Sequence, residues 1–183
     1  MNLENGEYII RCFLDDLSEL CYISGPPNVN KYVHPQPSPH ALVKRINRDT
    51  RTKKIRERDL PPECFVEVIH RDNYGTILLR QSATKRYATV YQEQTSSSID
   101  GNAPKISFIK FPDDPTRGPI VASEFKLVAP TGDEADGVAI LSMSTECYVK
   151  INATTDFLYP VCDDISQLPL QDRFVFEKRF GSF

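Results

Sequence analysis

The side chains best suited to catalysis are the histidines and cysteines, but their spacing forms no catalytic or metal-binding motif. His34, His40 and His70 lie in proline-rich or strand-like segments without a His-Glu-x-x-His pattern, and the chain has neither Gly-x-Ser-x-Gly nor a phosphate-cradling loop. A thiol nucleophile, Cys64 or Cys147, paired with one of these histidines is the one enzymatic arrangement left open. We therefore expect a protein that is not an enzyme and that needs no cofactor and no metal.

The five cysteines include no Cys-x-x-Cys pair, and four of them stand in apolar, strand-like runs. An odd number without paired spacing predicts neither a zinc site nor a closed disulfide framework. Free cysteine is among the most buried residue types, so we interpret Cys12, Cys21, Cys64, Cys147 and Cys162 as small core side chains in a reducing compartment. With no signal-peptide pattern and no run of about 18 apolar residues, we expect a cytoplasmic protein without a membrane partner.

Two polar segments are candidates for binding. Arg71 to Gly75 is a tight polar turn between two strand patterns, so its tip should project into water. Residues 44–58 hold eight lysines and arginines without interleaved aromatic residues. That composition predicts either a patch for an acidic partner or a solvated loop, and because base stacking needs aromatic side chains we expect no nucleic acid.

Strands must position these segments. Phe125, Leu127 and Ala129 alternate with polar residues, a turn-forming stretch follows over 130–137, and a second apolar run begins at once. Strands joined this closely pair antiparallel. Similar patterns predict about thirteen short strands, over 6–13, 20–24, 31–34, 41–47, 64–70, 76–81, 86–92, 106–111, 125–129, 138–142, 148–152, 157–161 and 173–180. The longest helix candidate, Leu14 to Leu20, is only about two turns long.

A faint internal repeat refines this all-β prediction. Gly6, Gly75 and Gly137 each precede an apolar strand and stand 69 and 62 residues apart. A period in the sixties, three times in the chain, fits three four-stranded lobes around a pseudo-threefold axis. We therefore predict a single β-trefoil domain over residues 1–183, with about twelve to thirteen strands.

Several short segments resemble one family of β-trefoils. Residues 3–11, Leu-Glu-Asn-Gly-Glu-Tyr-Ile-Ile-Arg, resemble the opening strand of the mycocypins, the fungal clitocypin and macrocypin protease inhibitors. Residues 33–49, with Pro39-His40 before a strand, look like a macrocypin passage, and Ala135 to Val138 looks like the turn into its ninth strand. The segments agree with the family in order and spacing.

The resemblance implies a monomeric inhibitor whose loops block proteases. In mycocypins the first and third inter-strand loops occlude papain-like cysteine proteases, and the loop between the fifth and sixth strands inhibits legumain or trypsin. The corresponding residues here are Leu17 and Ser18, then Pro35, Gln36 and Pro37, and finally Arg71, Asp72 and Asn73. Asn73 would suit an asparaginyl protease and Arg71 a trypsin-like pocket. The first loop departs from the family, because Leu14 to Leu20 has three acids and no glycine.

Two other classes of binding protein remain open. A carbohydrate-binding trefoil, a lectin, would stack a sugar on an aromatic ring and hold its hydroxyls with polar groups, as Tyr159 with Asp163 or Tyr91 with Gln92 and Asn102 could. The chain has no Trp, which disfavours the ricin type with its Gln-x-Trp element. A signalling or cytoskeletal trefoil would bind through the basic loop 44–58. We take protease inhibition as the leading hypothesis, with a glycan partner as the alternative.

Overall fold

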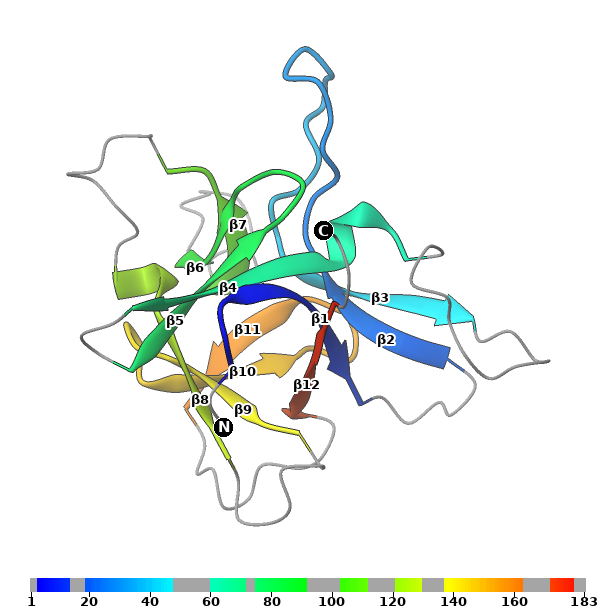
Figure 1. Cartoon of the computed structure of the whole chain (residues 1–183). Helices are drawn as coiled ribbons and strands as arrows, with labels where there is room; N and C mark the ends of the chain where they lie inside the picture. The colour runs from blue at the N-terminus through cyan, green and yellow to red at the C-terminus, as the bar shows by residue number, and fades with distance from the viewer. Residues whose placement is uncertain are drawn as a thin grey trace.

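The computed structural model describes residues 3–13, 19–47, 60–71, 75–91, 103–111, 121–129, 137–162 and 172–179. Across these ranges it has twelve β-strands, all paired antiparallel in one continuous sheet, and two short 3-10 helices, η2 (Pro62–Cys64) and η4 (Val121–Ser123). No helix among the described residues is long and apolar enough to cross a membrane. Figure 1 shows the sheet curling around itself instead of lying flat.

Six strands form a closed barrel. They are β1 (Gly6–Cys12), β4 (Phe65–Arg71), β5 (Thr76–Gln81), β8 (Phe125–Val128), β9 (Ala139–Ser142) and β12 (Phe174–Lys178). Each pairs with the next in that order, and β12 pairs with β1. The ring closes between β9 and β12, where the amide nitrogens of Val138 and Phe174 each lie 2.8 Å from the other's carbonyl oxygen.

Gly137 is required at this closure for two reasons. Its φ of 86° lies in the left-handed region that side-chain-bearing residues avoid, and an added Cβ would lie 2.9 Å from the Phe174 carbonyl oxygen. The turn glycine of the sequence pattern therefore lets two barrel strands approach each other.

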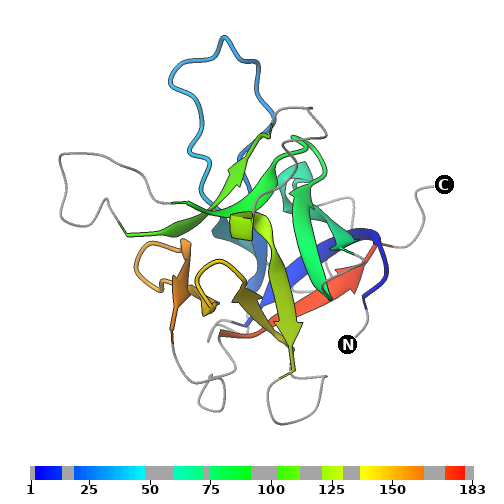
Figure 2. The ribbon, with the colours of Figure 1, turned by 90° about the vertical axis from the view of Figure 1, so that its left-hand side faces the viewer.

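Three hairpins cap one end of the barrel. They are β2 (Glu19–Ser24) with β3 (Leu42–Asn47), β6 (Tyr87–Tyr91) with β7 (Lys105–Ile109), and β10 (Cys147–Ile151) with β11 (Leu158–Val161). Single bridges, His40 to Ser107 and Leu42 to Phe157, join the first hairpin to the other two. Figure 2 shows the hairpins and barrel from the side. A six-stranded barrel with three capping hairpins is the β-trefoil, so the fold prediction is confirmed.

The strand register sharpens the predicted repeat. Tyr8, Ile77 and Val138 each face the last barrel strand of their own lobe, and they stand 69 and 61 residues apart. The spacing of 62 between the glycines differs by one residue from the spacing of 61 between Ile77 and Val138. The reason is that Gly137 directly precedes Val138, whereas Gly6 and Gly75 stand two residues before Tyr8 and Ile77. Tyr8, Ile77 and Val138 belong to the common hydrophobic core. The residues two positions further along each chain segment, Ile10, Leu79 and Ile140, belong to the same core.

One of the thirteen predicted strands is wrong. Residues 31–34 form a turn and a bend in a loop without a β-partner, and Tyr32 and Val33 are exposed there instead of packed. Their apolar side chains give the local sequence pattern of a strand. The flanking prolines, however, lack the backbone N–H groups that β-sheet hydrogen bonding needs. The helix candidate Leu14 to Leu20 ends in β2, and its residues 14–18 lie outside the described part of the chain.

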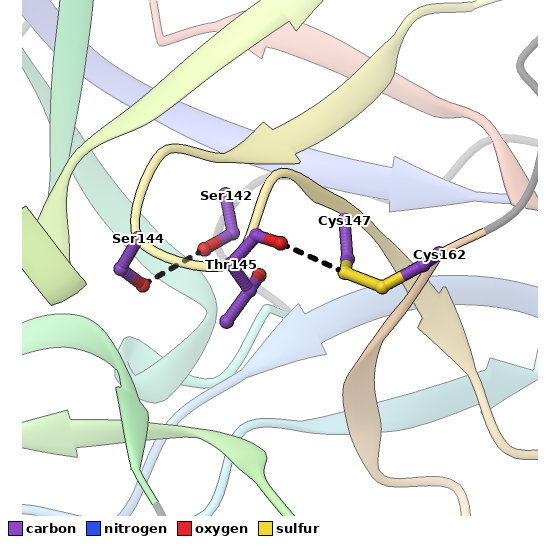
Figure 3. Close-up of a disulfide and its surroundings, with 5 residues drawn as sticks. All are labelled: Ser142, Ser144, Thr145, Cys147 and Cys162. Atoms are coloured by element: carbon purple, nitrogen blue, oxygen red, sulfur yellow. Dashed lines mark hydrogen bonds between the residues drawn. A yellow bond between two sulfur atoms is a disulfide. The ribbon is translucent and has the colours of Figure 1, made fainter.

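The cysteines differ in part from the expectation of free core thiols. Cys147 and Cys162 form a disulfide across β10 and the end of β11. Because Tyr148 pairs with Val161, the two cysteines are the next residues in register, and their Cα atoms are 4.3 Å apart. Figure 3 shows the disulfide beside the β9–β10 turn, where the hydroxyls of Ser142 and Ser144 lie 3.2 Å apart.

The other three cysteines, Cys12, Cys21 and Cys64, are buried thiols outside the disulfide, as predicted. Cys12 lies opposite Cys21 in the β1–β2 register, and a hydrogen bond from the Cys21 side chain together with burial raises the pKa of the Cys12 thiol. Burial raises the pKa of the Cys64 thiol to about 11, so this thiol stays protonated at neutral pH.

Gln81 is the largest buried polar side chain that links separate parts of the fold. Its amide nitrogen donates to the carbonyl oxygens of Pro26 at 2.8 Å and Glu63 at 3.3 Å, and the Thr84 hydroxyl donates to its amide oxygen at 2.5 Å. Gly25 makes room for it, since a Cβ there would lie 2.8 Å from the Gln81 side-chain carbon. This amide therefore holds the start of the 26–40 loop against β5.

We predict that Gln81→Ala lowers the free energy of unfolding by about 2–3 kcal/mol, because the buried Pro26 carbonyl oxygen loses its donor and the Glu63 carbonyl oxygen keeps only the Gly25 amide. Thr84→Ala is the matched control and should cost only about 1 kcal/mol, since it leaves both donated bonds in place. Urea denaturation followed by circular dichroism measures both values. Equal losses in the two variants would contradict a central role for Gln81.

Candidate functional site

The most prominent feature of the described surface is the segment 26–40, which we call the protruding loop. It leaves β2, projects away from the barrel in both views, and returns to β3 (Figures 1 and 2). Hydrogen bonds fix both ends. The Gly25 amide donates to the Glu63 carbonyl oxygen at 3.1 Å, and the Ala41 amide to the Ile106 carbonyl oxygen at 2.8 Å. A long loop anchored in this way holds its tip at a defined place relative to the scaffold.

The protruding loop is braced from within by Gln36. Its amide nitrogen donates to the carbonyl oxygens of Asn30 at 3.3 Å, Lys31 at 3.1 Å and Val33 at 2.5 Å. Asn30 adds a local turn, because its side-chain oxygen accepts from the Tyr32 amide at 3.1 Å and its carbonyl oxygen accepts from the Val33 amide at 3.0 Å. Side-chain hydrogen bonds therefore hold this proline-rich loop together from within.

The tip of the protruding loop exposes apolar side chains. Tyr32 is 74% exposed, Val29 and Val33 are also exposed, and the Lys31 ammonium lies 5.0 Å from the centre of the Tyr32 ring. Such side chains contribute binding energy only when a partner covers them, because burial of apolar surface is the main favourable term in association. The loop thus presents an apolar tip on a braced stem.

A polar hollow of about 150 Å³ lies at the foot of the protruding loop, and we call it the foot hollow. It is lined by both stems of the loop, by the β5–β6 turn and by the residue after β7, namely by Pro26, Pro27, Asn28, Val29, Gln36, Pro37, Thr84, Arg86 and Lys110. Figure 2 shows the end of β7 beside the base of the loop. The lining mixes amides, a hydroxyl and two cations with proline rings.

Internal hydrogen bonds position the polar lining. The Asn28 amide nitrogen donates to the Ala83 carbonyl oxygen at 3.2 Å, which ties the loop to the β5–β6 turn. The Thr84 hydroxyl is held by Gln81, and it accepts from the Arg86 amide at 3.4 Å. These bonds use the amide nitrogens of Asn28 and Gln36, so the two amide oxygens are the acceptors left for a ligand.

The predicted inhibitory residues fall in different places. Pro35, Gln36 and Pro37 belong to the protruding loop, and the last two line the foot hollow. Arg71 ends β4, and its guanidinium lies 3.3 Å from the Glu124 carboxylate, so it is engaged within the fold. Leu17, Ser18, Asp72 and Asn73 lie outside the described residues.

Four of the candidate catalytic residues have contacts or burial within the fold. His40 Nδ1 lies 2.8 Å from the Ser107 hydroxyl where two hairpins join, and His70 Nε2 bonds the Leu3 carbonyl oxygen. Cys147 is consumed by its disulfide, and Cys64 is fully buried. Neither cysteine therefore offers an exposed thiol, and no group of three potential metal ligands occurs among the described residues.

The other predicted binding segments are only partly described. Arg45, at the start of the basic segment, forms a bidentate ion pair with Asp156, so its charge is compensated within the fold. Residues 48–58 lie outside the described chain, as do Asp163, Gln92 and Asn102 of the proposed sugar sites. Of their aromatic partners, Tyr91 is exposed and Tyr159 is half-buried.

Sequence reasoning missed most of the foot hollow. Asn28, Thr84, Arg86 and Lys110 come from three separated segments, and none of them belongs to a motif. The only local signal was the break at residues 25–28, which marks a turn without saying what it faces. Cross-strand register brings the residues together.

Comparison with solved structures supports the fold. The BEL β-trefoil matches over 98% of this chain and 97% of its own, with 12% identity and a TM-score of 0.56. The Rhizoctonia solani agglutinin matches over 98% and 99%, with 10% identity and a TM-score of 0.57. The Polyporus squamosus lectin, bound to Neu5Acα2-6Galβ1-4GlcNAc, matches over 97% of this chain and 50% of its own, with 13% identity and a TM-score of 0.57. No protein-family model and no curated protein sequence matches this chain.

We predict that Gln36→Ala loosens the protruding loop without unfolding the barrel. Hydrogen exchange of the Val33 amide should accelerate about threefold to tenfold, because the stem loses bonds that each contribute about 1 kcal/mol. Tyr32→Ala is the matched control, since it removes the exposed ring and leaves the brace intact. Unchanged exchange in Gln36→Ala, measured by NMR, would show that the amide does not hold the loop.

Proposed function

We propose that this protein is a carbohydrate-binding β-trefoil that binds a sugar in the foot hollow, and that it acts by binding and not by catalysis. The observation that carries the proposal is the hollow itself, where polar groups from both stems of the protruding loop converge with those of the β5–β6 turn. We further propose that residues 1–183 act as one monomeric domain.

The lining of the foot hollow suits sugar hydroxyls. The amide oxygens of Asn28 and Gln36 can accept from them, and the side chains of Arg86 and Lys110 can donate to them. A concave site with a few fixed polar groups is the usual form of a small-molecule site. The lining contains no aromatic ring, so polar contacts would contribute most of the binding energy.

The similar structures lend this proposal support of a second kind. Two of the three are by name a lectin and an agglutinin, and one of them holds a sialylated trisaccharide. Their sequence identity to this chain is 13% or less, so the similarity supports a shared fold and does not assign a role to any single residue. Trefoil loops vary independently of the core, so the site must be argued from this chain's own loops.

We predict that the purified protein binds defined glycans on an array, and that Asn28→Ala weakens that binding at least about tenfold because a positioned acceptor and the tie to Ala83 are both lost. Ser38→Ala, on the same loop but outside the lining, is the matched control and should bind normally. Titration calorimetry on the best array hit measures the affinities. Equal affinity of Asn28→Ala and Ser38→Ala for the glycan would show that the sugar does not bind in the foot hollow.

A second candidate function is protease inhibition, as the mycocypin resemblance implies. The observation that favours it is the braced protruding loop that carries Pro35, Gln36 and Pro37, because a rigid loop loses little conformational entropy on entering a cleft. In this proposal Leu17 and Ser18 form a second contact loop, and Arg71, Asp72 and Asn73 form a separate site for a legumain-like or trypsin-like protease.

For inhibition we predict that any activity against papain is weakened at least about tenfold by Gln36→Ala, because the loop must then be ordered on binding. Asn73→Ala should abolish inhibition of legumain and leave papain inhibition unchanged. Inhibition constants against papain, legumain and trypsin test both statements. A wild-type protein that inhibits none of the three proteases would refute this second candidate.

A further inference from the structure

We infer that the foot hollow selects an anionic sugar, one that bears a carboxylate or a sulfate group. The inference rests on the proposed sugar-binding function and adds the chemical class of the ligand. Its basis is the pair of cations on the hollow, Arg86 and Lys110, both of which line it.

Continuing the β6–β7 register by one residue beyond its last pair would set these two cations against each other. Tyr87 pairs with Ile109, so Arg86 and Lys110 are the next residues outward on the two chains. Directly opposed residues of an antiparallel pair have Cβ atoms about 4.5–5.5 Å apart, and like charges at such a position destabilise the sheet. An anion between the two side chains would turn this repulsion into attraction.

Arg86 also differs from most other arginines of the described structure. Five of them have a carboxylate within 4.0 Å, and the pairs are Arg11 with Glu177, Arg45 with Asp156, Arg71 with Glu124, Arg80 with Glu67 and Arg179 with Glu7. Within the described chain neither Arg86 nor Lys110 has an acidic partner, and the lining of the foot hollow includes no acid. The fold thus supplies carboxylates to five of its other described arginines and leaves these two cations facing a hollow.

The remaining lining narrows the ligand from any anion to an acidic sugar. A guanidinium binds a carboxylate or sulfate through two parallel hydrogen bonds, and an ammonium adds a point charge. The amide oxygens of Asn28 and Gln36 accept hydrogen bonds only, so they would repel a bare anion and attract hydroxyl groups. A ligand that satisfies both sets carries an anionic group beside hydroxyls, as sialic acids, uronic acids and sulfated sugars do.

The test compares matched ligands and matched variants. Wild-type protein is titrated with sialyllactose, a glucuronic-acid-terminated disaccharide and 6-sulfogalactose, and with lactose as the neutral reference. The double variant Arg86→Gln/Lys110→Gln removes both cations from the hollow. Lys126→Gln/Lys178→Gln removes two lysines outside the lining, so it matches the change in net charge. Inorganic sulfate is titrated separately to detect an anion that binds without a sugar.

We expect at least one acidic sugar to bind at least about tenfold more tightly than lactose, with an affinity that falls as salt rises. Arg86→Gln/Lys110→Gln should lose that preference, and Lys126→Gln/Lys178→Gln should keep it. Binding of lactose with equal or higher affinity would overturn the anionic inference and leave the proposed function standing. Binding of inorganic sulfate alone, or no binding at all, would overturn both.

Discussion

The closure of the barrel between β9 and β12 is the constraint on which the rest of this structure depends. Among the described residues, the backbone link between the two strands is the pair of mutual hydrogen bonds of Val138 and Phe174, whereas β4 and β5 share six residue pairs. Gly137 permits that contact because it has no Cβ to meet the Phe174 carbonyl oxygen. Once the ring is closed, strand twist and stagger follow from geometry, and the three hairpins have one end of the barrel to cap.

The scaffold and the candidate site are coupled through one buried amide. Gln81 lies at the register position that Cys12 and Ser142 hold in the other lobes, yet it alone reaches out to the loop after β2 and to η2. The second lobe thereby carries a support for a loop of the first lobe. Pseudo-threefold folds acquire distinct sites in this way, because one lobe can gain a polar contact while the equivalent positions stay small.

The protruding loop and the foot hollow share residues, so the two candidate functions are physically linked. Gln36 braces the loop with its amide nitrogen and contributes its side chain to the hollow. A ligand that bonds this amide would therefore also stiffen the exposed tip with Tyr32. The ion pairs elsewhere, such as Arg45 with Asp156, engage their charges within the fold and add little specificity on an exposed surface. Electrostatic selectivity then concentrates where cations lack such partners.

The sequence by itself determined the β-class, twelve of the strands and the threefold repeat, because apolar alternation and turn residues act over a few neighbours. It misassigned residues 31–34, where the alternation has no partner strand to pair with, and it paired no cysteines, since Cys147 and Cys162 meet only through the β10–β11 register. Only the tertiary structure decided that Asn28 bonds the turn before Thr84 and that Arg86 and Lys110 line the same hollow. Such juxtapositions depend on loop closure and cross-strand register, and no residue carries the signal of a partner that lies tens of positions away.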